Sequence, residues 1–225
     1  MSTYPHNIGR RQFRESRRGI GGFSWARARP KFSVKFCVHY LREYLKKPGQ
    51  FGAVVPSSSE LAKAMLEGLD LENARSVLEY GPGNGTVTDH IRRKISPDTK
   101  LAVIEINPRM AELFKERHPD VLLFEDTVEN ARVICDYAGM QSVDCIISSL
   151  PWATFSEGMQ VRFLEEMMRV LRPGGGFVTF AYVHGLALPM SKRFANRLHA
   201  YFGSVSKSPV IWRNVPPAFV YRCRR

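Results

Sequence analysis

The stretch VLEYGPGNG, residues 77–85, decides the fold of this chain. Its first four residues are typical of the end of a buried strand, and Gly81, Gly83 and Gly85 follow directly. Glycines let a backbone turn sharply and approach a ligand closely, because no Cβ blocks the approach. The stretch therefore predicts a strand, a ligand-binding glycine loop and the start of a helix.

The spacing of the loop and the acid before it indicate which ligand it holds. Loops that bind dinucleotides favour the pattern G-x-G-x-x-G, with a pyrophosphate at the helix N-terminus. Here the pattern is G-x-G-x-G, and Glu79 precedes the first glycine by two residues. A carboxylate at that place repels a pyrophosphate and attracts a cation. We therefore predict S-adenosylmethionine as the cofactor, because it carries an ammonium group and a sulfonium but no phosphate.

Two further acids follow the next two expected strands. Glu105 lies 20 residues after Gly85, where an acid can accept hydrogen bonds from ribose hydroxyls. Asp126 follows the expected strand 121–124, and we predict that it accepts a hydrogen bond from the adenine amino group. Taken alone, Glu105 would read as an ordinary surface carboxylate. The loop and the two acids stand in consecutive strand-helix units, and this arrangement favours a cofactor site.

Strand and helix patterns alternate along most of the chain. A capping-box pattern at residues 57–60 opens a helix, and the strands after it are followed by helices. Two short segments, 210–212 and 218–221, are expected to form a closing hairpin. We therefore predict an α/β fold with a doubly wound, mostly parallel sheet. The expected strands are 76–80, 101–106, 121–124, 143–148 and 176–183, and the expected helices are 84–94, 108–117, 128–138, 158–171 and 189–202.

The composition fits one globular domain with a short appendage. The chain has 225 residues, of which 44% are apolar, so its core needs no disulfide or metal to hold it together. The four cysteines show no C-x-x-C spacing, which argues against a metal site and favours a reducing compartment. Residues 173–190 contain no Asp, Glu, Lys or Arg, but their glycines and prolines predict a strand and a loop rather than a membrane span.

Positive charge is concentrated at the two ends of the chain. Residues 1–47 carry 12 Lys or Arg and two acids, and residues 190–225 carry eight Lys or Arg and no acid. The middle, residues 48–189, carries 13 Lys or Arg and 19 acids. This asymmetry indicates an anionic partner, either a membrane surface or a nucleic acid, although a solvated basic face would show the same pattern.

The basic N-terminal extension, residues 1–47, is expected to meet a membrane. Residues 32–47 show apolar side chains at helical spacing and basic side chains on the other side, which predicts an amphipathic helix. Such a helix suits an anionic membrane surface. Residues 1–31 lack the apolar segment of a secretory signal. They are rich in Arg and poor in acids, so an organelle transit peptide is an alternative interpretation.

The glycine loop, Glu105 and Asp126 together resemble the cofactor site of class I S-adenosylmethionine-dependent methyltransferases. The resemblance covers residues 48–225, taken here as the methyltransferase domain, and implies a Rossmann-like sheet of seven strands with a reversed last strand. It also implies a role for each site residue: the methionine end of the cofactor for Glu79, Gly81, Gly83 and Gly85, the ribose for Glu105, and the adenine for Asp126.

Four segments resemble the bacterial phospholipid N-methyltransferases in particular. They are FGAVVPS at 51–57, SSLP at 148–151, FAY at 180–182 and IWRNVPPA at 211–218. That family methylates the amine of phosphatidylethanolamine and is related to the rRNA adenine dimethyltransferases. The resemblance implies a cytoplasmic enzyme, peripheral on the inner face of the cytoplasmic membrane. It also implies that Ser148 and Leu150 belong to the cofactor site, beside the methyl group that is transferred.

The sequence departs from the family pattern in two places. Residues 152–155, WATF, follow Leu150 and Pro151 where smaller aliphatic residues are usual, and the Arg-rich residues 1–30 are an extra segment. These departures leave the head group open between phosphatidylethanolamine and ornithine lipid. Trp152 is a candidate for a cation–π contact with the growing ammonium, which would hold a partly methylated product for another round. The alternative is that Trp152 and Phe155 pack the lid of the pocket.

Methyl transfer to an amine needs a neutral lone pair, so the site needs a group that takes the proton. Tyr182 and His184 are candidates, because they stand where open α/β sheets place their ligands. Tyr40, on the expected amphipathic helix, is another. For His184 the alternative is an ordinary polar loop position. The apolar residues 185–190 are expected to receive the acyl chains of the lipid.

The competing functions are an RNA adenine methyltransferase and a non-catalytic membrane-binding module. The RNA enzymes usually place Asn or Asp where this chain has Ser149. In this chain Trp152 also follows Pro151, and both features argue against an RNA substrate. A binding module would leave the complete cofactor set unexplained. We therefore predict successive methylation of a membrane lipid amine, without a metal, and do not favour nucleic acid as a partner.

Overall fold

The structure is a computed structural model of the chain, and it describes residues 58–225. The expected helix 32–47 and the expected domain boundary after residue 47 lie outside this range. Within it, strands and helices alternate as the apolar patterns predict. The elements are α4 (Ser59–Leu66), β1 (Ser76–Tyr80), α5 (Thr86–Arg92), β2 (Lys100–Ile104), α6 (Pro108–Arg117), β3 (Leu122–Phe124), η2 (Val128–Asn130), α7 (Ala131–Tyr137), β4 (Val143–Ser148), η3 (Trp152–Thr154), α8 (Glu157–Val170), β5 (Leu171–Tyr182), η4 (Val183–Ala187), α9 (Pro189–Tyr201), β6 (Ser204–Lys207) and β7 (Ala218–Arg224).

The strands form one seven-stranded sheet in the order β3-β2-β1-β4-β5-β7-β6. The pairs among β1 to β5 are all parallel, whereas β7 runs antiparallel to both of its neighbours. The prediction of a mostly parallel sheet with a reversed last strand is therefore confirmed. The strand order reverses between β1 and β4, and open α/β sheets bind their ligands outside the carboxyl ends of the strands at such a point.

The closing hairpin differs from the prediction in its first strand. β7 pairs with β6, for example Val205 with Cys223, whereas the expected segment 210–212 contributes only an isolated bridge between Ile211 and Ala218. The prediction failed because β6 is the edge strand of the sheet. Three of its four residues are exposed, so it carries no apolar signal in the sequence. The more apolar segment that follows it belongs to the loop between β6 and β7.

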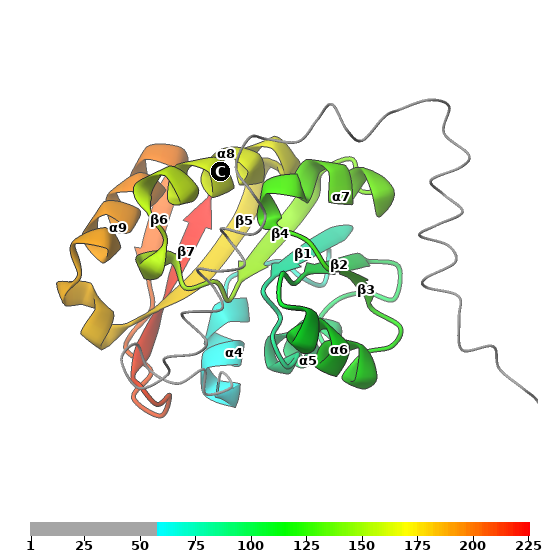
Figure 1. Cartoon of the computed structure of the whole chain (residues 1–225), viewed down its shortest axis with the longest axis horizontal. Helices are drawn as coiled ribbons and strands as arrows, with labels where there is room; N and C mark the ends of the chain where they lie inside the picture. The colour runs from blue at the N-terminus through cyan, green and yellow to red at the C-terminus, as the bar shows by residue number, and fades with distance from the viewer. Residues whose placement is uncertain (1–57) are drawn as a thin grey trace, which may run out of the picture. The chain divides into compact units, whose positions relative to one another are not determined.

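Helices cover both faces of the sheet (Figure 1). The helices α7, α8 and α9 bury their apolar sides against one face, while α4, α5 and α6 cover the other. Ser58 caps α4, because its Oγ accepts a hydrogen bond from the Leu61 amide at 3.1 Å. Ser58, the second serine of the expected capping-box pattern, is therefore the N-cap residue of α4.

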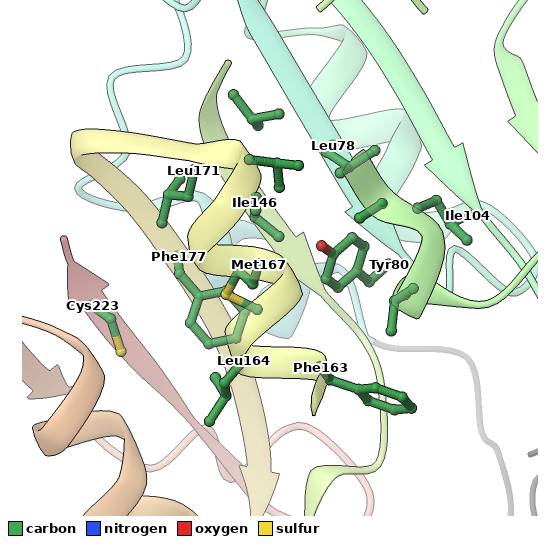
Figure 2. Close-up of a cluster of buried hydrophobic side chains, with 14 of the residues drawn as sticks. Leu78, Tyr80, Ile104, Ile146, Phe163, Leu164, Met167, Leu171, Phe177 and Cys223 are labelled. Carbon is green, nitrogen blue, oxygen red and sulfur yellow. The ribbon is translucent and has the colours of Figure 1, made fainter. Parts of the chain in front are cut away.

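Helix α8 carries much of the larger core. Its buried side chains recur every three or four residues, as on one face of an amphipathic helix. Figure 2 shows Phe163, Leu164 and Met167 of α8 in one cluster with Phe177 of β5 and Ile146 of β4. Packing of this kind fixes α8 on the sheet beside the end of β4.

The uncharged segment 173–190 is strand and loop, as predicted. It comprises most of β5, the short helix η4 and the first residues of α9. Within the range that the structure describes, no helix is both long and apolar enough to cross a membrane.

Phe177 offers a test of this core. Its ring stacks on Phe202 with centroids 5.5 Å apart and meets the ring of Trp152 edge-on at 6.0 Å. We expect Phe177→Ala to lower the free energy of unfolding by about 3–5 kcal/mol, because a large buried ring is lost and a cavity remains. Urea unfolding measures the change, and Val133→Ala on the exposed side of α7 should change it by at most about 0.5 kcal/mol. Equal values for the two variants would contradict this packing.

Candidate functional site

The glycine loop joins β1 to α5 and packs tightly at two points. A Cβ on Gly81 would lie 2.9 Å from Leu150 Cδ2, and a Cβ on Gly85 would lie 2.4 Å from His118 Nε2. Both glycines have positive φ, 66° and 81°, where other residues are strained. A Cβ on Gly83 would meet no atom within 4 Å, so the middle of the loop faces open space. This space is where a ligand can approach the backbone.

Glu105 fixes the loop to the end of β2. Its Oε2 accepts a hydrogen bond from the Gly83 amide at 3.3 Å, and its Oε1 accepts one from the Asn107 amide at 2.9 Å. Burial raises the pKa of this carboxyl, and the hydrogen bonds from backbone amides oppose the rise. The structure therefore brings Glu105 to the loop, as predicted. A role in binding ribose stays a prediction.

Glu79 is fully buried beneath the loop and does not line an open surface. Its Oε2 accepts a hydrogen bond from Thr88 Oγ1 at 2.6 Å, while its Oε1 has no hydrogen-bond partner among residues 58–225. Burial is the main cause that raises the pKa of this carboxyl from 4.5 to about 8. A buried carboxylate oxygen without a donor is costly, and a cation at the loop would offset that cost. This observation fits a cofactor with an ammonium group.

An open cavity lies beside the loop at the carboxyl ends of β1, β2 and β4. Asp126 reaches it from the end of β3, where its Oδ1 accepts hydrogen bonds from the Thr127 amide and from Asn130 Nδ2. Four predicted site residues therefore meet in one cavity. Its lining comprises Gly81, Ile104, Glu105, Ile106, Asp126, Thr127, Val128, Leu150, Phe155, Met159 and Phe163.

The apolar part of the cavity lining was predicted only in Phe155, as a residue that packs the lid of the pocket. Phe155 lies in the turn before α8, and Met159 and Phe163 reach the cavity from α8 itself. The spacing of Met159 and Phe163 reads only as the buried face of a helix, so no local signal marks them as cavity residues. The cavity therefore combines apolar side chains with the acids Glu105 and Asp126. A slot lined in this way suits a flat heteroaromatic ring with polar edges.

Ser148 is buried below the cavity and acts on the turn after β4. Its Oγ accepts hydrogen bonds from Trp152 Nε1 at 3.0 Å and from the Leu150 amide at 3.3 Å. Leu150 itself lines the cavity, directly against Gly81. Of this predicted pair, only Leu150 borders the cavity, and Ser148 holds it in place.

The expected contact between Trp152 and a substrate ammonium is wrong, because Trp152 is 2% exposed. Its ring stacks on Phe194 with centroids 4.8 Å apart and meets Phe155, Phe163 and Phe177 edge-on. A ring enclosed in this way leaves no face for a cation. Trp152 is a core residue that anchors the turn 148–152, so packing was the correct alternative.

Tyr182 and His184 lie together at the end of β5, with their rings stacked 5.5 Å apart. Neither borders the cavity described above. Burial raises the pKa of the Tyr182 phenol, so this side chain is a neutral hydrogen-bonding group rather than a base. His184 is exposed. The third candidate, Tyr40, lies outside the described residues.

Across residues 58–225, no three His, Cys, Asp or Glu side chains come close enough to hold a metal ion. Cys135, Cys145 and Cys223 are free and buried, and burial raises the pKa of each thiol.

Comparison with known proteins identifies the domain around this cavity. Residues 77–175, which run from β1 into β5, match the methyltransferase domain family. The match includes every cofactor residue predicted from the sequence, from Glu79 to Leu150.

Three proteins show how far the similarity of this chain to known methyltransferases extends. The chain is 28% identical over 188 residues to the ornithine lipid N-methyltransferase of Singulisphaera acidiphila, which covers 82% of this chain and 94% of that protein. The O-methyltransferase TomG of Streptomyces achromogenes, solved in complex with S-adenosylmethionine, has a TM-score of 0.60 at 18% identity, covering 82% of this chain and 89% of that one. Fibrillarin of Aeropyrum pernix, with natively bound S-adenosylmethionine, has a TM-score of 0.56 at 16% identity, covering 72% and 74%.

These comparisons agree with the fold and the cofactor predicted from the sequence. The two solved structures share the fold of this domain at low sequence identity, and each was solved with S-adenosylmethionine. The open space over Gly83, the unpartnered oxygen of Glu79 and the slot beside Asp126 fit that cofactor. That the loop holds the methionine end and the cavity the nucleoside stays a prediction.

Two substitutions test the cofactor site. We expect Glu105→Ala and Gly83→Val each to weaken binding of S-adenosylmethionine at least tenfold, which is about 1.4 kcal/mol. The first removes the carboxylate that fixes the loop, and the second places a side chain in the open space over it. Calorimetric titration measures the affinity, and Glu112→Ala on the exposed side of α6 is the matched control. Unchanged affinity in both variants would contradict the assignment.

Glu79 makes the stability of the cofactor-free protein depend on pH. The pKa of Glu79 is about 8 in the fold and near 4.5 when exposed. Its contribution to the free energy of unfolding is therefore fully present at low pH and is lost as the pH rises toward 8. Relative to Glu79→Gln, the wild type should lose up to about 3 kcal/mol of unfolding free energy from about pH 5.5 to about pH 8. Urea unfolding of both proteins across this range measures the difference. Parallel curves would show that Glu79 does not titrate as its burial requires.

Proposed function

We propose that this methyltransferase transfers methyl groups from S-adenosylmethionine to the primary amine of a membrane lipid, and that ornithine lipid is its substrate. The observation that carries the proposal is the similarity to an ornithine lipid N-methyltransferase over 94% of that protein. The alignment spans 188 residues, well beyond the domain match at 77–175, so it extends into segments that accompany the cofactor site.

The residues around the cavity have separable tasks in this proposal. When bound, S-adenosylmethionine supplies an electrophilic methyl group on its sulfonium. Glu105 and the loop orient the cofactor, and the slot beside Asp126 takes its adenine. Leu150, held by Ser148 and by the buried Trp152, closes the cavity against Gly81. Rigid placement of the two reactants supplies about 7–11 kcal/mol of the barrier in well-oriented reactions.

The amine must lose a proton before it attacks the methyl group. A lipid amine resembles a lysine side chain, with a pKa of about 10.4, so its neutral form is scarce near neutral pH. Of the two candidates on β5 and η4, His184 suits the task of proton acceptor, because a ring nitrogen of a neutral imidazole can accept a proton. Tyr182 stacks on His184 and, with its raised pKa, orients the ring as a neutral partner. Neither residue lines the cofactor cavity. We assign the end of β5, where they lie, to the approach of the lipid amine.

Methyl transfer with defined acceptors tests the proposal. Purified full-length protein and labelled S-adenosylmethionine are incubated with mixed micelles that contain ornithine lipid, phosphatidylethanolamine or no amino lipid, and separately with rRNA. We expect label in ornithine lipid, with successively methylated products in the mass spectrum, and none in rRNA. Glu105→Ala should remove this activity by weakening cofactor binding. Label in phosphatidylethanolamine alone would correct the head group, and label in rRNA would overturn the proposal.

The same assay, run across pH, tests the proton acceptor. We expect His184→Gln to lower kcat and to flatten the acidic side of the pH profile, while the affinity for S-adenosylmethionine stays unchanged. Tyr182→Phe keeps the stacked ring and should retain most of kcat. A normal pH profile in His184→Gln would exclude this histidine as the proton acceptor.

A further inference from the structure

Two residues of the loop between β6 and β7 expose large apolar side chains. Trp212 is 72% exposed and Val215 is 71% exposed, the highest values among the large apolar side chains that the structure describes. Leu186 and Leu188, in and just after η4, follow at 39% and 41%. We call these four residues the apolar tip. Exposed apolar groups gathered on neighbouring segments mark binding surfaces more often than single ones do.

The two segments of the apolar tip lie side by side at one end of the sheet. Tyr182, the last residue of β5, pairs with Ala218, the first of β7, so η4 and the loop leave the sheet together (Figure 1). The Val183 amide donates a hydrogen bond to the Pro217 carbonyl at 2.9 Å. This is the carboxyl end of the parallel strands, the same end at which the cofactor cavity opens.

Asn214 holds the loop so that Trp212 and Val215 point outward. Its buried side chain donates from Nδ2 to the Pro216 carbonyl at 2.7 Å and accepts at Oδ1 from the Ser58 amide at 3.1 Å. A buried amide with both ends satisfied fixes the backbone around it. The exposure of the two neighbouring side chains is therefore a property of a held loop.

Two cations stand in or next to the segments of the apolar tip. Arg213 is exposed between its two loop residues, and Lys192 is exposed on the first turn of α9. Neither forms an ion pair within residues 58–225. The sequence has no Asp or Glu after Glu166, so the two segments that carry the apolar tip contain no acid of their own. Tryptophan beside arginine, with aliphatic side chains and without acids, suits the interface of an anionic bilayer.

The described chain begins at Ser58, whose amide donates a hydrogen bond to Asn214 of the loop. Residues 1–47, which come earlier in the sequence, carry 12 basic and two acidic residues, a net charge of +10. A charge of this sign is attracted by an anionic surface.

We propose that the apolar tip is a docking surface that inserts into the interface of an anionic lipid bilayer. The inference rests on the proposed function in one respect, since a lipid substrate requires the carboxyl end of the sheet to face a membrane. Insertion of Trp212 and Val215, with Arg213 at the head groups, brings that end and the cofactor cavity to the lipid amine.

Quenching of tryptophan fluorescence tests the insertion directly. The chain has three tryptophans, and Trp25→Phe leaves only Trp212 and the buried Trp152. With full-length Trp25→Phe protein and vesicles of phosphatidylcholine and phosphatidylglycerol, we expect a blue shift of the emission and quenching by brominated acyl chains. Adding Trp212→Phe should abolish the quenching. Emission that does not respond to brominated vesicles would overturn the proposal.

Sedimentation with the same vesicles measures the contribution of the apolar tip. We expect Trp212→Ala with Val215→Asp to weaken binding at least tenfold. The matched control is Leu122→Ala with Val133→Asp, which changes two exposed apolar residues elsewhere and should stay within twofold of the wild type. Unchanged vesicle binding in the tip variant, or a tip variant that instead turns a dimer into a monomer in analytical ultracentrifugation, would overturn the proposal.

The failure of the proposed function can be told apart from the failure of docking. On a short-chain, monomeric acyl-ornithine the tip variant should keep the wild-type kcat, while on vesicles it should lose most of its activity. Equal loss on both substrates would overturn docking as the role of the apolar tip. If the wild type methylates neither substrate but Trp212 is still quenched by brominated lipid, docking stands and the substrate assignment falls.

Discussion

The parallel pairing of β1 with both β2 and β4 is the constraint on which the rest of the molecule depends. Its register places Tyr80 level with Ile104 on one side and with Ser148 on the other. The three strands therefore end together, and the residues that follow them leave the sheet at the same edge. The glycine loop, Glu105 and Leu150 meet only for this reason. Backbone hydrogen bonds continue the pairing past the strand ends, from Gly81 to Ile104 and from Ser149 to Tyr80.

Burial divides the acids of the site into different roles. Glu105 remains at the edge of the cavity and is satisfied by backbone amides, so it can hold the loop and still face a ligand. Glu79 is taken fully inside, with one oxygen unpartnered and a strongly raised pKa. An arrangement of this kind is unfavourable in the empty site and becomes favourable when a cation arrives. The buried carboxyl thus lowers the stability of the cofactor-free protein and raises its affinity for a cationic cofactor.

The turn after β4 shows how a core residue serves a site that it does not touch. Trp152 is enclosed by aromatic rings from α8, α9 and β5, and its indole donates to Ser148. This bond and the packing around it leave Leu150 little freedom, and Leu150 is what closes the cavity against the glycine loop. Phe155 takes part in both structures, since it packs on Trp152 and also lines the cavity. At this point the core and the site are one structure.

The sequence by itself determined the alternation of strands and helices, the position of the glycine loop and the acids that surround it. These follow from local rules, since apolar periodicity and glycine spacing are written in neighbouring residues. Only the tertiary structure decided that Trp152 is enclosed and that Glu79 lies beneath the loop. It alone showed that β6, with its exposed residues, is the edge strand and that Met159 and Phe163 line the cavity. Each of these facts depends on contacts between residues far apart in the chain. A local sequence pattern does not tell which distant side chains will pack against a given residue.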